Sequence, residues 1–161
     1  MNFLFDKFTI NKMRKHLISL FEYNDWANRK LLETIKLLPE KEDAMKLFSH
    51  LISAQDKWFN RISKHKEDSL FNWFGETHSI ETVEQKWNES YKNWNDLLKN
   101  TEIQTDEDII FKRPSDDKEL KVRLEDLILQ LNYHSIHHVR IQQVFLLFAE
   151  QYWRYEHDFQ A

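Results

Sequence analysis

Three of the eight histidines in this 161-residue chain lie within five positions, at His134, His137 and His138. His134 and His138 are four residues apart, a spacing that places two side chains on one face of a helix, one turn apart. Two imidazoles in that arrangement can bind the same metal ion. About 0.4 such pairs are expected by chance from eight histidines in 161 residues, so the spacing alone is weak evidence.

The residues around this pair alternate in spacings of three and four. The series is Leu124, Leu127, Leu131, His134, His138, Ile141, Phe145 and Phe148. Such a heptad seam predicts a helix with one side turned toward the inside of a bundle. Both imidazoles should therefore be buried, where unpaired polar groups are costly. They need either a shared metal ion or hydrogen bonds to buried carbonyls or carboxylates, and the seam leaves both readings open.

A metal site needs a third protein ligand, and His50 is the best candidate. It lies in the middle of a predicted helix among apolar neighbours, in Leu47-Phe-Ser-His-Leu-Ile52. It falls at the edge of the apolar arc of that helix, and an edge position can still face inward because each helix of a bundle touches two others. The remaining histidines are expected at the surface or beside the ligands: His16, His65, His78, His137 and His157.

Four helical segments must position these histidines. Hydrophobic spacing predicts helices over about 11–38, 40–64, 79–98 and 124–148. Ser79 is a plausible N-cap for the third, and Pro39 joins the first two so tightly that they should be antiparallel neighbours. Residues 109–112 and 119–122 flank a turn-like Pro114-Ser-Asp-Asp117 and predict a small β-hairpin before helix four. The expected fold is all-α, a single-domain four-helix bundle over residues 1–161 with long crossover connections.

The inward faces of the first and third helices follow from the same spacing. On the first helix the apolar or small positions are Met13, Leu17, Leu20, Ala27, Leu31 and Leu38, interrupted by Asn24 and Thr34. On the third, Trp87 and Trp94 are seven residues apart and are predicted to be core residues.

The composition excludes several other classes of protein. One Gly and two Pro are too few for turn-rich sheet folds. The absence of Cys excludes disulfides, thiolate ligands and a protein thiol nucleophile, and it is compatible with the cytoplasm. The net charge of −4 lacks the basic footprint of a nucleic-acid binder. The longest apolar run, residues 144–149, is far shorter than a membrane span. We expect a cytoplasmic protein with neither nucleic acid nor membrane as a partner.

Three segments in order resemble the DinB-like superfamily, the damage-inducible and bacillithiol-transferase-like four-helix bundles. Residues 23–32, YNDWANRKLL, resemble its opening signature; residues 48–62, FSHLISAQDKWFNRI, its first ligand helix; and residues 124–138, LEDLILQLNYHSIHH, its second. The resemblance covers about residues 23–148. It implies metal ligands at His50, His134 and His138, the three positions that the residue patterns favoured, and it implies a homodimer.

Three imidazole ligands leave at least one coordination position open, as in catalytic zinc sites. The resemblance implies a divalent metal ion (Zn, Ni, Fe or Mn) and two reactions: transfer of a small-molecule thiol to an electrophile, which ranks first, and metal-dependent hydrolysis. Because the chain has no Cys, the sulfur must come from a cosubstrate. The alternative is a non-enzymatic, stress-induced helical dimer with a structural metal or none.

The chain departs from the family pattern after the last ligand. Family members often continue with Arg-Gly-Gln, whereas this chain reads Val139-Arg-Ile-Gln-Gln143. The glycine is absent, and neither Gln142 nor Gln143 occupies the usual place. No role is therefore assigned to either glutamine.

Overall fold

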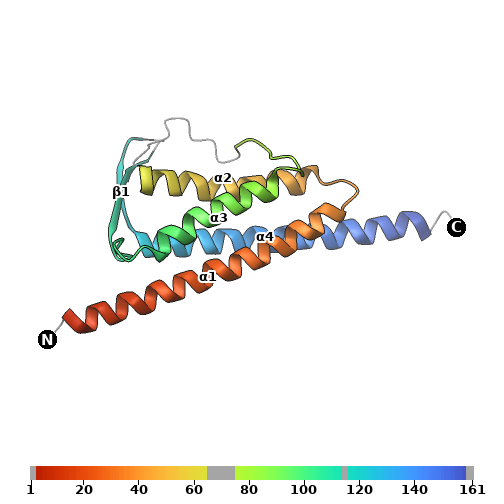
Figure 1. Ribbon diagram of the computed structural model, residues 1–161. Coiled ribbons are helices and arrows are strands. Elements are labelled where there is room, and N and C mark those ends of the chain that lie inside the picture. Colours follow the sequence, from red (N-terminus) through yellow and green to blue (C-terminus); the bar gives the residue numbers. More distant parts are fainter. Residues whose placement is uncertain (1–2, 65–74, 114–115, 159–161) are drawn as a thin grey trace.

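The computed structural model consists of four helices and one β-hairpin, which confirms the predicted fold class (Figure 1). In chain order the elements are α1 (Phe3–Leu37), α2 (Glu42–Lys64), α3 (Val83–Lys99), β1 (Asp108–Lys112), β2 (Glu119–Arg123) and α4 (Leu124–Asp158). The structure describes residues 3–64, 75–113 and 116–158, with side chains described for 11–63, 75–113 and 116–141.

The observed helix ends differ from the predicted ones at three places. Helix α1 begins at Phe3 rather than near residue 11, and α4 continues to Asp158 rather than ending near residue 148. Helix α3 begins at Val83, because Ser79 starts a preceding turn instead: its carbonyl oxygen accepts the N–H groups of Thr82 and Val83 at 3.1 and 2.9 Å. Hydrophobic periodicity locates a helix better than it locates its ends.

The helices form a bundle in which α1 packs against α4 and α3, while α2 packs against α3 and α4. Helices α1 and α2 run antiparallel, but they occupy diagonal corners and touch only marginally, so the prediction that they are neighbours was wrong. A short connection fixes the distance between two helix ends, but not which faces of the helices meet. Helices α1 and α4 extend past the other two at opposite ends of the bundle (Figure 1).

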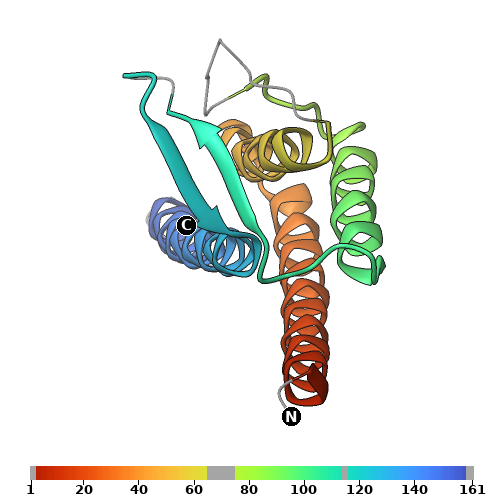
Figure 2. The ribbon, with the colours of Figure 1, turned by 90° about the vertical axis from the view of Figure 1, so that its left-hand side faces the viewer.

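The hairpin lies at one end of the bundle and holds the start of α4 (Figure 2). Its strands pair antiparallel from Asp108 opposite Arg123 to Lys112 opposite Glu119. The first N–H groups of a helix have no partner within the helix. Here the N–H of Leu124 donates to the carbonyl of Glu107 at 2.9 Å, and that of Glu125 donates to Thr105 at 2.8 Å. The segment before the hairpin thus fixes where α4, the helix with two of the candidate ligands, begins.

The core consists of two clusters of buried apolar side chains. The cluster nearer the hairpin contains Leu17, Phe21, Trp94, Leu97, Leu98, Leu124, Leu127, Ile128 and Leu131. The other contains Leu31, Leu32, Ile35, Met45, Phe48, Ile52, Val83 and Trp87. The prediction that Trp87 and Trp94 are core residues is confirmed, because both are fully buried.

The buried face of α1 agrees only in part with the one predicted from its apolar residues, because Leu17 and Leu31 are buried as predicted and the other predicted positions are not. Its buried seam runs through Arg14, Leu17, Phe21, Asn24, Asn28, Leu31 and Ile35, in alternating steps of three and four. Leu20 and Ala27 lie at the flank of that face and are only half-buried, while Thr34 is exposed. The prediction departs from the seam elsewhere because three of the seven seam positions are polar, so a search for apolar spacing shifts to the neighbouring positions.

Between the two apolar clusters lies a layer of buried polar side chains. Its members come from all four helices: Asn24, Asn28, Ser49, His50, Gln55, Ser90, Asn132 and Ser135. An apolar layer of similar shape would be at least as stable, because buried polar groups contribute only when fully paired. Such a layer in the middle of a core is typical of a site that function maintains at a cost in stability.

The Asp56 carboxyl lies beside this layer, and replacing it measures how much stability a buried, incompletely paired polar group costs. Burial raises the pKa of Asp56, against a hydrogen bond from Ser90, and its Oδ1 has no partner among the described residues. A raised folded-state pKa means that the carboxyl stabilises the fold only at low pH, and this stabilisation is lost as pH rises through the folded-state pKa. We expect Asp56→Asn to raise the Tm at pH 7 by a few degrees.

Thermal unfolding measured from pH 7 down to pH 3.5 would check this expectation. The gain in Tm over wild type should shrink as the pH falls, because the Asp56 carboxyl of the wild type then becomes protonated and neutral. The exposed Asp96, which pairs with Lys92 at the surface, provides the control substitution Asp96→Asn. If Asp56→Asn were less stable than the wild type at pH 7, the ionised carboxylate of Asp56 would have better partners in the fold than a neutral side chain has, and the expectation would be wrong.

Candidate metal centre

The three predicted histidines lie together in the polar layer, His50 on α2 and the other two on α4. The Nε2 atoms of His50 and His134 are 3.3 Å apart, and those of His134 and His138 are 3.1 Å apart. One ligand nitrogen from each of the three lies within 4.8 Å of the others, so the group could hold a metal ion. His50 is buried, and the two α4 histidines are half-buried.

Hydrogen bonding alone does not satisfy this arrangement. A neutral imidazole nitrogen carries either one hydrogen or one lone pair. The Nε2 of His134 faces the Nε2 of both neighbours, so it can form one full hydrogen bond, and the other contact stays unpaired. A cation at the point where the nitrogens converge would satisfy all of them at once.

The spacing of the nitrogens also fits a shared cation. With bond lengths near 2.0–2.1 Å, two imidazole nitrogens on one tetrahedral zinc ion are about 3.3 Å apart. The two measured Nε2 separations, 3.3 and 3.1 Å, are close to that value. The residues present therefore fit a divalent metal ion by donor type, number and spacing.

The alternative reading, in which the seam histidines bond buried carbonyls or carboxylates, finds no support among the described residues. The hydrogen-bond contacts of His134 join it to His50 and His138. The Nδ1 of His138 is buried and has no partner in the described part of the chain. A carbonyl or carboxylate partner for that ring is therefore not found among the described residues.

The electrostatic environment keeps the α4 histidines neutral. Burial lowers the pKa of His134, and the neighbouring His50 and His137 lower it further. Burial, followed by His134, His50 and His137, lowers the pKa of His138 to about 4. Both groups are thus unprotonated near pH 7, which is the form that binds a metal ion.

This shift predicts how metal affinity depends on pH. If three histidines with an ordinary pKa of about 6.5 formed the site, up to three protons would compete with the metal just below that pH. Because the pKa values of His134 and His138 are lowered, we expect fewer than two protons to compete between about pH 6.5 and pH 5.5. The slope of log affinity against pH, measured for Zn²⁺ with a competing chelator, gives this number directly. A slope near three would contradict the neutral site.

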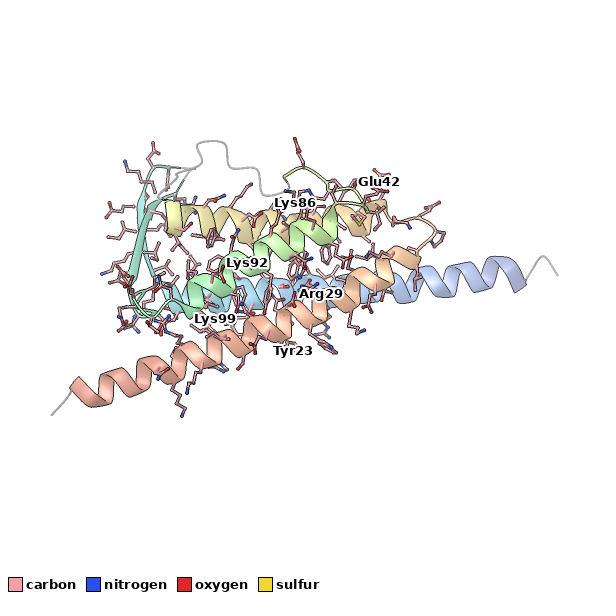
Figure 3. All side chains as sticks on the ribbon, in the orientation of Figure 1. Tyr23, Arg29, Glu42, Lys86, Lys92 and Lys99 are labelled. Carbon is pink, nitrogen blue, oxygen red and sulfur yellow. The ribbon has the colours of Figure 1, made fainter. Side chains whose placement is uncertain are left out.

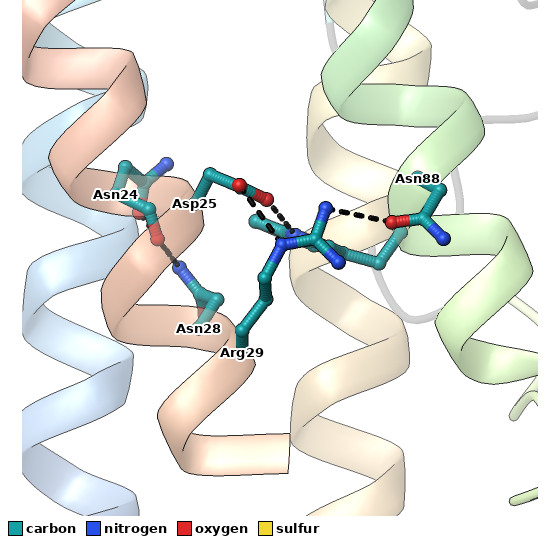
Figure 4. A network of polar contacts seen from close by, with 6 residues as sticks. Asn24, Asp25, Asn28, Arg29 and Asn88 are labelled. Atoms are coloured by element: carbon teal, nitrogen blue, oxygen red, sulfur yellow. Dashed lines mark hydrogen bonds and ion pairs between the residues drawn. The ribbon is translucent and has the colours of Figure 1, made fainter. Parts of the chain in front are cut away.

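A hydrogen-bonded network between α1 and α4 lies next to the ligands. The Nδ2 of Asn28 contacts the backbone carbonyl and the Oδ1 of Asn24 at 2.8 and 2.7 Å (Figure 4). The same atom lies 2.8 Å from the Oγ of Ser135, the residue that follows His134. All three side chains are buried. The network joins α1 to the turn of α4 that carries the metal ligands.

A second network joins α1 to α3 through Asp25. Its Oδ2 pairs with the Nε of Arg29 at 2.9 Å, and its Oδ1 accepts the indole N–H of Trp87 at 2.7 Å. Arg29 in turn donates to the Oδ1 of Asn88 at 2.7 Å (Figure 4). Asp25 is therefore a structural acceptor between two helices, engaged on both oxygens.

The connection that precedes α3 packs against α2 close to His50. The backbone N–H of His78 donates to the Oγ of Ser49 at 2.8 Å. A Cβ added at Gly75 would lie 2.4 Å from the Oγ of Ser53 and 3.1 Å from its Cβ, so a larger residue there would require the Ser53 side chain to move. The single glycine of the chain thus lets this segment lie directly on the helix that carries His50.

Among the described residues, His16, His78 and His137 do not join the cluster. His16 is exposed on α1, and His137 is exposed on α4, with its ring centroid 5.6 Å from that of His138. His78 lies in the connection before α3. The side chains of His65 and His157 lie outside the described residues, as do those of Gln142 and Gln143.

The polar neighbours of the site were not predicted from the sequence. Asn28, Ser90 and Ser135 are buried, yet none was selected from the sequence. The available signal was the interruption of the apolar spacing at Asn24, which marks the layer on α1. On α4 the seam histidines themselves mark the same layer.

The comparisons with known proteins agree with this geometry. The model of the DinB superfamily matches residues 26–141, well over half of the chain and including all three clustered histidines. Neither the search of curated proteins nor that of solved structures found a significant match. Among the described residues, no helix combines the length and the apolar character needed to cross a membrane.

Proposed function

The chain belongs to the DinB superfamily, and from that membership and its three converging imidazoles we propose that it is a metal-dependent enzyme acting on a small-molecule thiol. His50, His134 and His138 would hold the divalent ion. The observation that supports this most strongly is the convergence of one ligand nitrogen from each of the three histidines, with the Nε2 of His134 facing the Nε2 of both others.

A divalent ion bound by three imidazoles supplies Lewis acidity, which favours the deprotonated form of a thiol or a water molecule in the remaining position. The chain's own contribution is a set of pre-positioned nitrogens, and burial keeps those of His134 and His138 neutral by lowering their pKa values. His134 and His138 are held one turn apart by α4, and the Asn28 contact to Ser135 anchors that turn against α1. Imidazole donors suit Zn, Ni and Fe, and Mn is the weakest-binding candidate of the series.

Thiol transfer is the preferred reaction. The thiol gives its proton to solvent, and its sulfur forms a bond to an electrophilic carbon while the leaving group departs with the electron pair of the broken bond. The chain has no Cys, so no protein sulfur competes for the metal or forms a covalent intermediate. The half-buried His134 and His138 leave the site open to a cosubstrate from solution.

Hydrolysis is the second candidate, because the same opening admits water. The two reactions separate in one assay on Zn²⁺-loaded protein. One arm uses 1-chloro-2,4-dinitrobenzene with 2-mercaptoethanol, cysteine or glutathione, and the other uses p-nitrophenyl acetate without thiol. We expect thiol-dependent turnover above the uncatalysed rate, which is lost in His134→Ala. Turnover of the ester alone would favour the hydrolase. Metal binding without turnover in either arm would favour the non-enzymatic helical protein.

We also propose a homodimer. The rings of Tyr23 and Trp26 on α1 lie 5.7 Å apart and are more than half exposed, and Tyr23 projects away from the other helices (Figure 3). Tyr133 and Ile136 are exposed large side chains on α4, the helix that packs against α1. Exposed aromatic side chains of this size are enriched at protein interfaces. Light scattering after size-exclusion chromatography should give twice the chain mass, and Trp26→Glu should give the monomer.

A further inference from the structure

Two buried serines lie next to the candidate ligands in the chain, Ser49 directly before His50 and Ser135 directly after His134. We propose that both serines are positioning residues of the metal centre: they fix the two ligand helices so that the three imidazoles converge before a metal ion binds. This inference rests on the proposed function in one respect, because it takes the three histidines as the metal ligands. It depends on neither the substrate nor the reaction.

Helix geometry explains why a residue next to a ligand can fix that ligand. Successive side chains of an α-helix point about 100° apart, since one turn takes 3.6 residues. A histidine that points to the other ligand helix therefore has a neighbour that points to a different element of the bundle. Ser49 and Ser135 are 2% and 1% exposed, so both side chains lie inside the protein.

Ser135 joins the ligand-bearing turn of α4 to α1. Its Oγ lies 2.8 Å from the Nδ2 of Asn28, a fully buried residue. The same Nδ2 lies 2.8 and 2.7 Å from the backbone carbonyl oxygen and the Oδ1 of Asn24 (Figure 4). One of its two N–H groups can thus donate to Ser135 while the two Asn24 oxygens share the other. Asn28 is therefore held within its own helix and, at the same time, holds α4.

A directional contact is needed at this level of α4. The backbone hydrogen bonds that fix the start of the helix are those of Leu124 and Glu125, and His134 lies ten residues, about 15 Å, beyond Leu124. The buried side chains in between are apolar: Leu127, Ile128 and Leu131. Apolar contacts are non-directional, so they constrain the rotation of a helix about its axis less sharply than a hydrogen bond does. The contact at Ser135 supplies that constraint beside His134.

Ser49 has the corresponding role on α2. Its Oγ accepts the backbone N–H of His78 at 2.8 Å. The next residue, Ser79, accepts the N–H of Val83, the first residue of α3, at 2.9 Å. The contact therefore ties the turn of α2 that carries His50 to the beginning of α3. Each ligand helix is thus fixed, beside its ligand, to an element other than its partner ligand helix.

The two serine contacts hold the ligand nitrogens at the spacing that a metal ion requires. The Nε2 atoms of His50 and His134 are 3.3 Å apart, and those of His134 and His138 are 3.1 Å apart. Three imidazoles that are already held together lose less conformational freedom when the ion binds, which favours binding. Loss of either serine contact should therefore weaken metal binding and loosen its geometry, although every ligand is still present.

The test replaces each serine in the whole chain, as Ser49→Ala and Ser135→Ala. Zn²⁺ affinity is measured against a competing chelator, and geometry is followed with Co²⁺, whose d–d absorption is intense in tetrahedral sites and weak at higher coordination numbers. We expect each variant to bind Zn²⁺ roughly tenfold more weakly, the lower end of the effect of losing a group that orients a ligand, and to show weaker Co²⁺ absorption. The Tm of the metal-free protein should change by a few degrees at most, because alanine is close to serine in size and favours helix.

The matched control is Ser90→Ala. Ser90 is 1% exposed, and its Oγ lies 3.4 Å from the Oε1 of Gln55, so its hydroxyl belongs to the same polar layer but does not neighbour a ligand. This substitution should leave the Zn²⁺ affinity and the Co²⁺ spectrum unchanged. Unchanged affinity and spectra in both Ser49→Ala and Ser135→Ala, a lower Tm as their only effect, or an equal loss in Ser90→Ala would overturn the inference while leaving the metal centre in place.

A double substitution tests the contact between Asn28 and Ser135. Asn28→Leu, which is similar in size, should weaken Zn²⁺ binding about as much as Ser135→Ala does. The two changes together should weaken it no further, because each removes the same contact. Additive losses would overturn the positioning role of Ser135 through Asn28. A wild-type protein that binds neither Zn²⁺ nor Co²⁺ at the three histidines would instead contradict the proposed function itself.

Discussion

Replacing His134 with alanine is expected to abolish metal binding while the protein stays folded. His134 is the central member of the cluster, because its Nε2 lies within 3.3 Å of the Nε2 of both other histidines. Loss of a group that merely orients a ligand costs about 10–100-fold in metal affinity, so loss of the ligand should cost at least about a hundredfold. Metal content after equilibration with Zn²⁺ should fall from about one ion per chain to near zero.

The fold should survive this change, since an unfilled imidazole cluster contributes little to stability. Circular dichroism in EDTA should show the same helix content and a Tm within a few degrees of wild type. His137→Ala is the matched control, because His137 is exposed and three residues away on the same helix. Unchanged metal content in His134→Ala would contradict the assignment, as would equal loss in His137→Ala.

Replacing Arg14 with methionine is expected to have the opposite effect, a large loss of stability with the metal site retained. The guanidinium of this buried residue donates to the carbonyls of Leu98 at 2.9 Å, Asn100 at 2.7 Å and Ile103. These carbonyls lie at the end of α3 and in the turn that follows it, and they would lose their charged donor together. We expect a loss of about 3 kcal/mol, equivalent to a Tm lower by about 6–12 °C.

Thermal unfolding of the metal-free protein would measure this loss. Arg113→Met removes an exposed arginine and should shift the Tm by less than about 2 °C. Below the transition, Arg14→Met should still bind one Zn²⁺ per chain, because Arg14 contacts none of the three histidines. A Tm within the range of the control would show that the three carbonyls find other donors.

The sequence predicted α4 well, because its periodicity and its chemistry coincide. Leu124, Leu127 and Leu131 are buried, and the two histidines continue the same seam. The fold class followed from the same kind of pattern together with the scarcity of glycine and proline. On α4 few positions of the seam are polar, so the apolar residues that precede the histidines define the face.

The face of α1 was predicted only in part by the same rule. Its seam includes Arg14, Asn24 and Asn28, which a search for apolar residues does not select. Arg14 and Asn28 are stabilised by partners that are distant in sequence, the α3 carbonyls and Ser135. Single-helix patterns cannot show such partners, and the diagonal placement of α1 and α2 depends on them as well.

The prediction of His50 succeeded less fully than that of the α4 face and more fully than that of the α1 face. The sequence made it a candidate by its apolar neighbours, and only the antiparallel packing of α2 on α4 brings it within 3.3 Å of His134. The polar layer around the cluster could be identified only from the folded structure. Its members are distributed over four helices, and their residue types are ordinary for a protein surface.

Anomalous diffraction from a crystal grown with one equivalent of Zn²⁺ would test the metal centre most directly. We expect a single peak at the zinc edge about 2.0–2.1 Å from the Nε2 atoms of His50, His134 and His138. This peak should be absent from crystals of the His134→Ala variant. A peak bound by other residues, or no peak at the three histidines under saturating Zn²⁺, would contradict the assignment of these ligands.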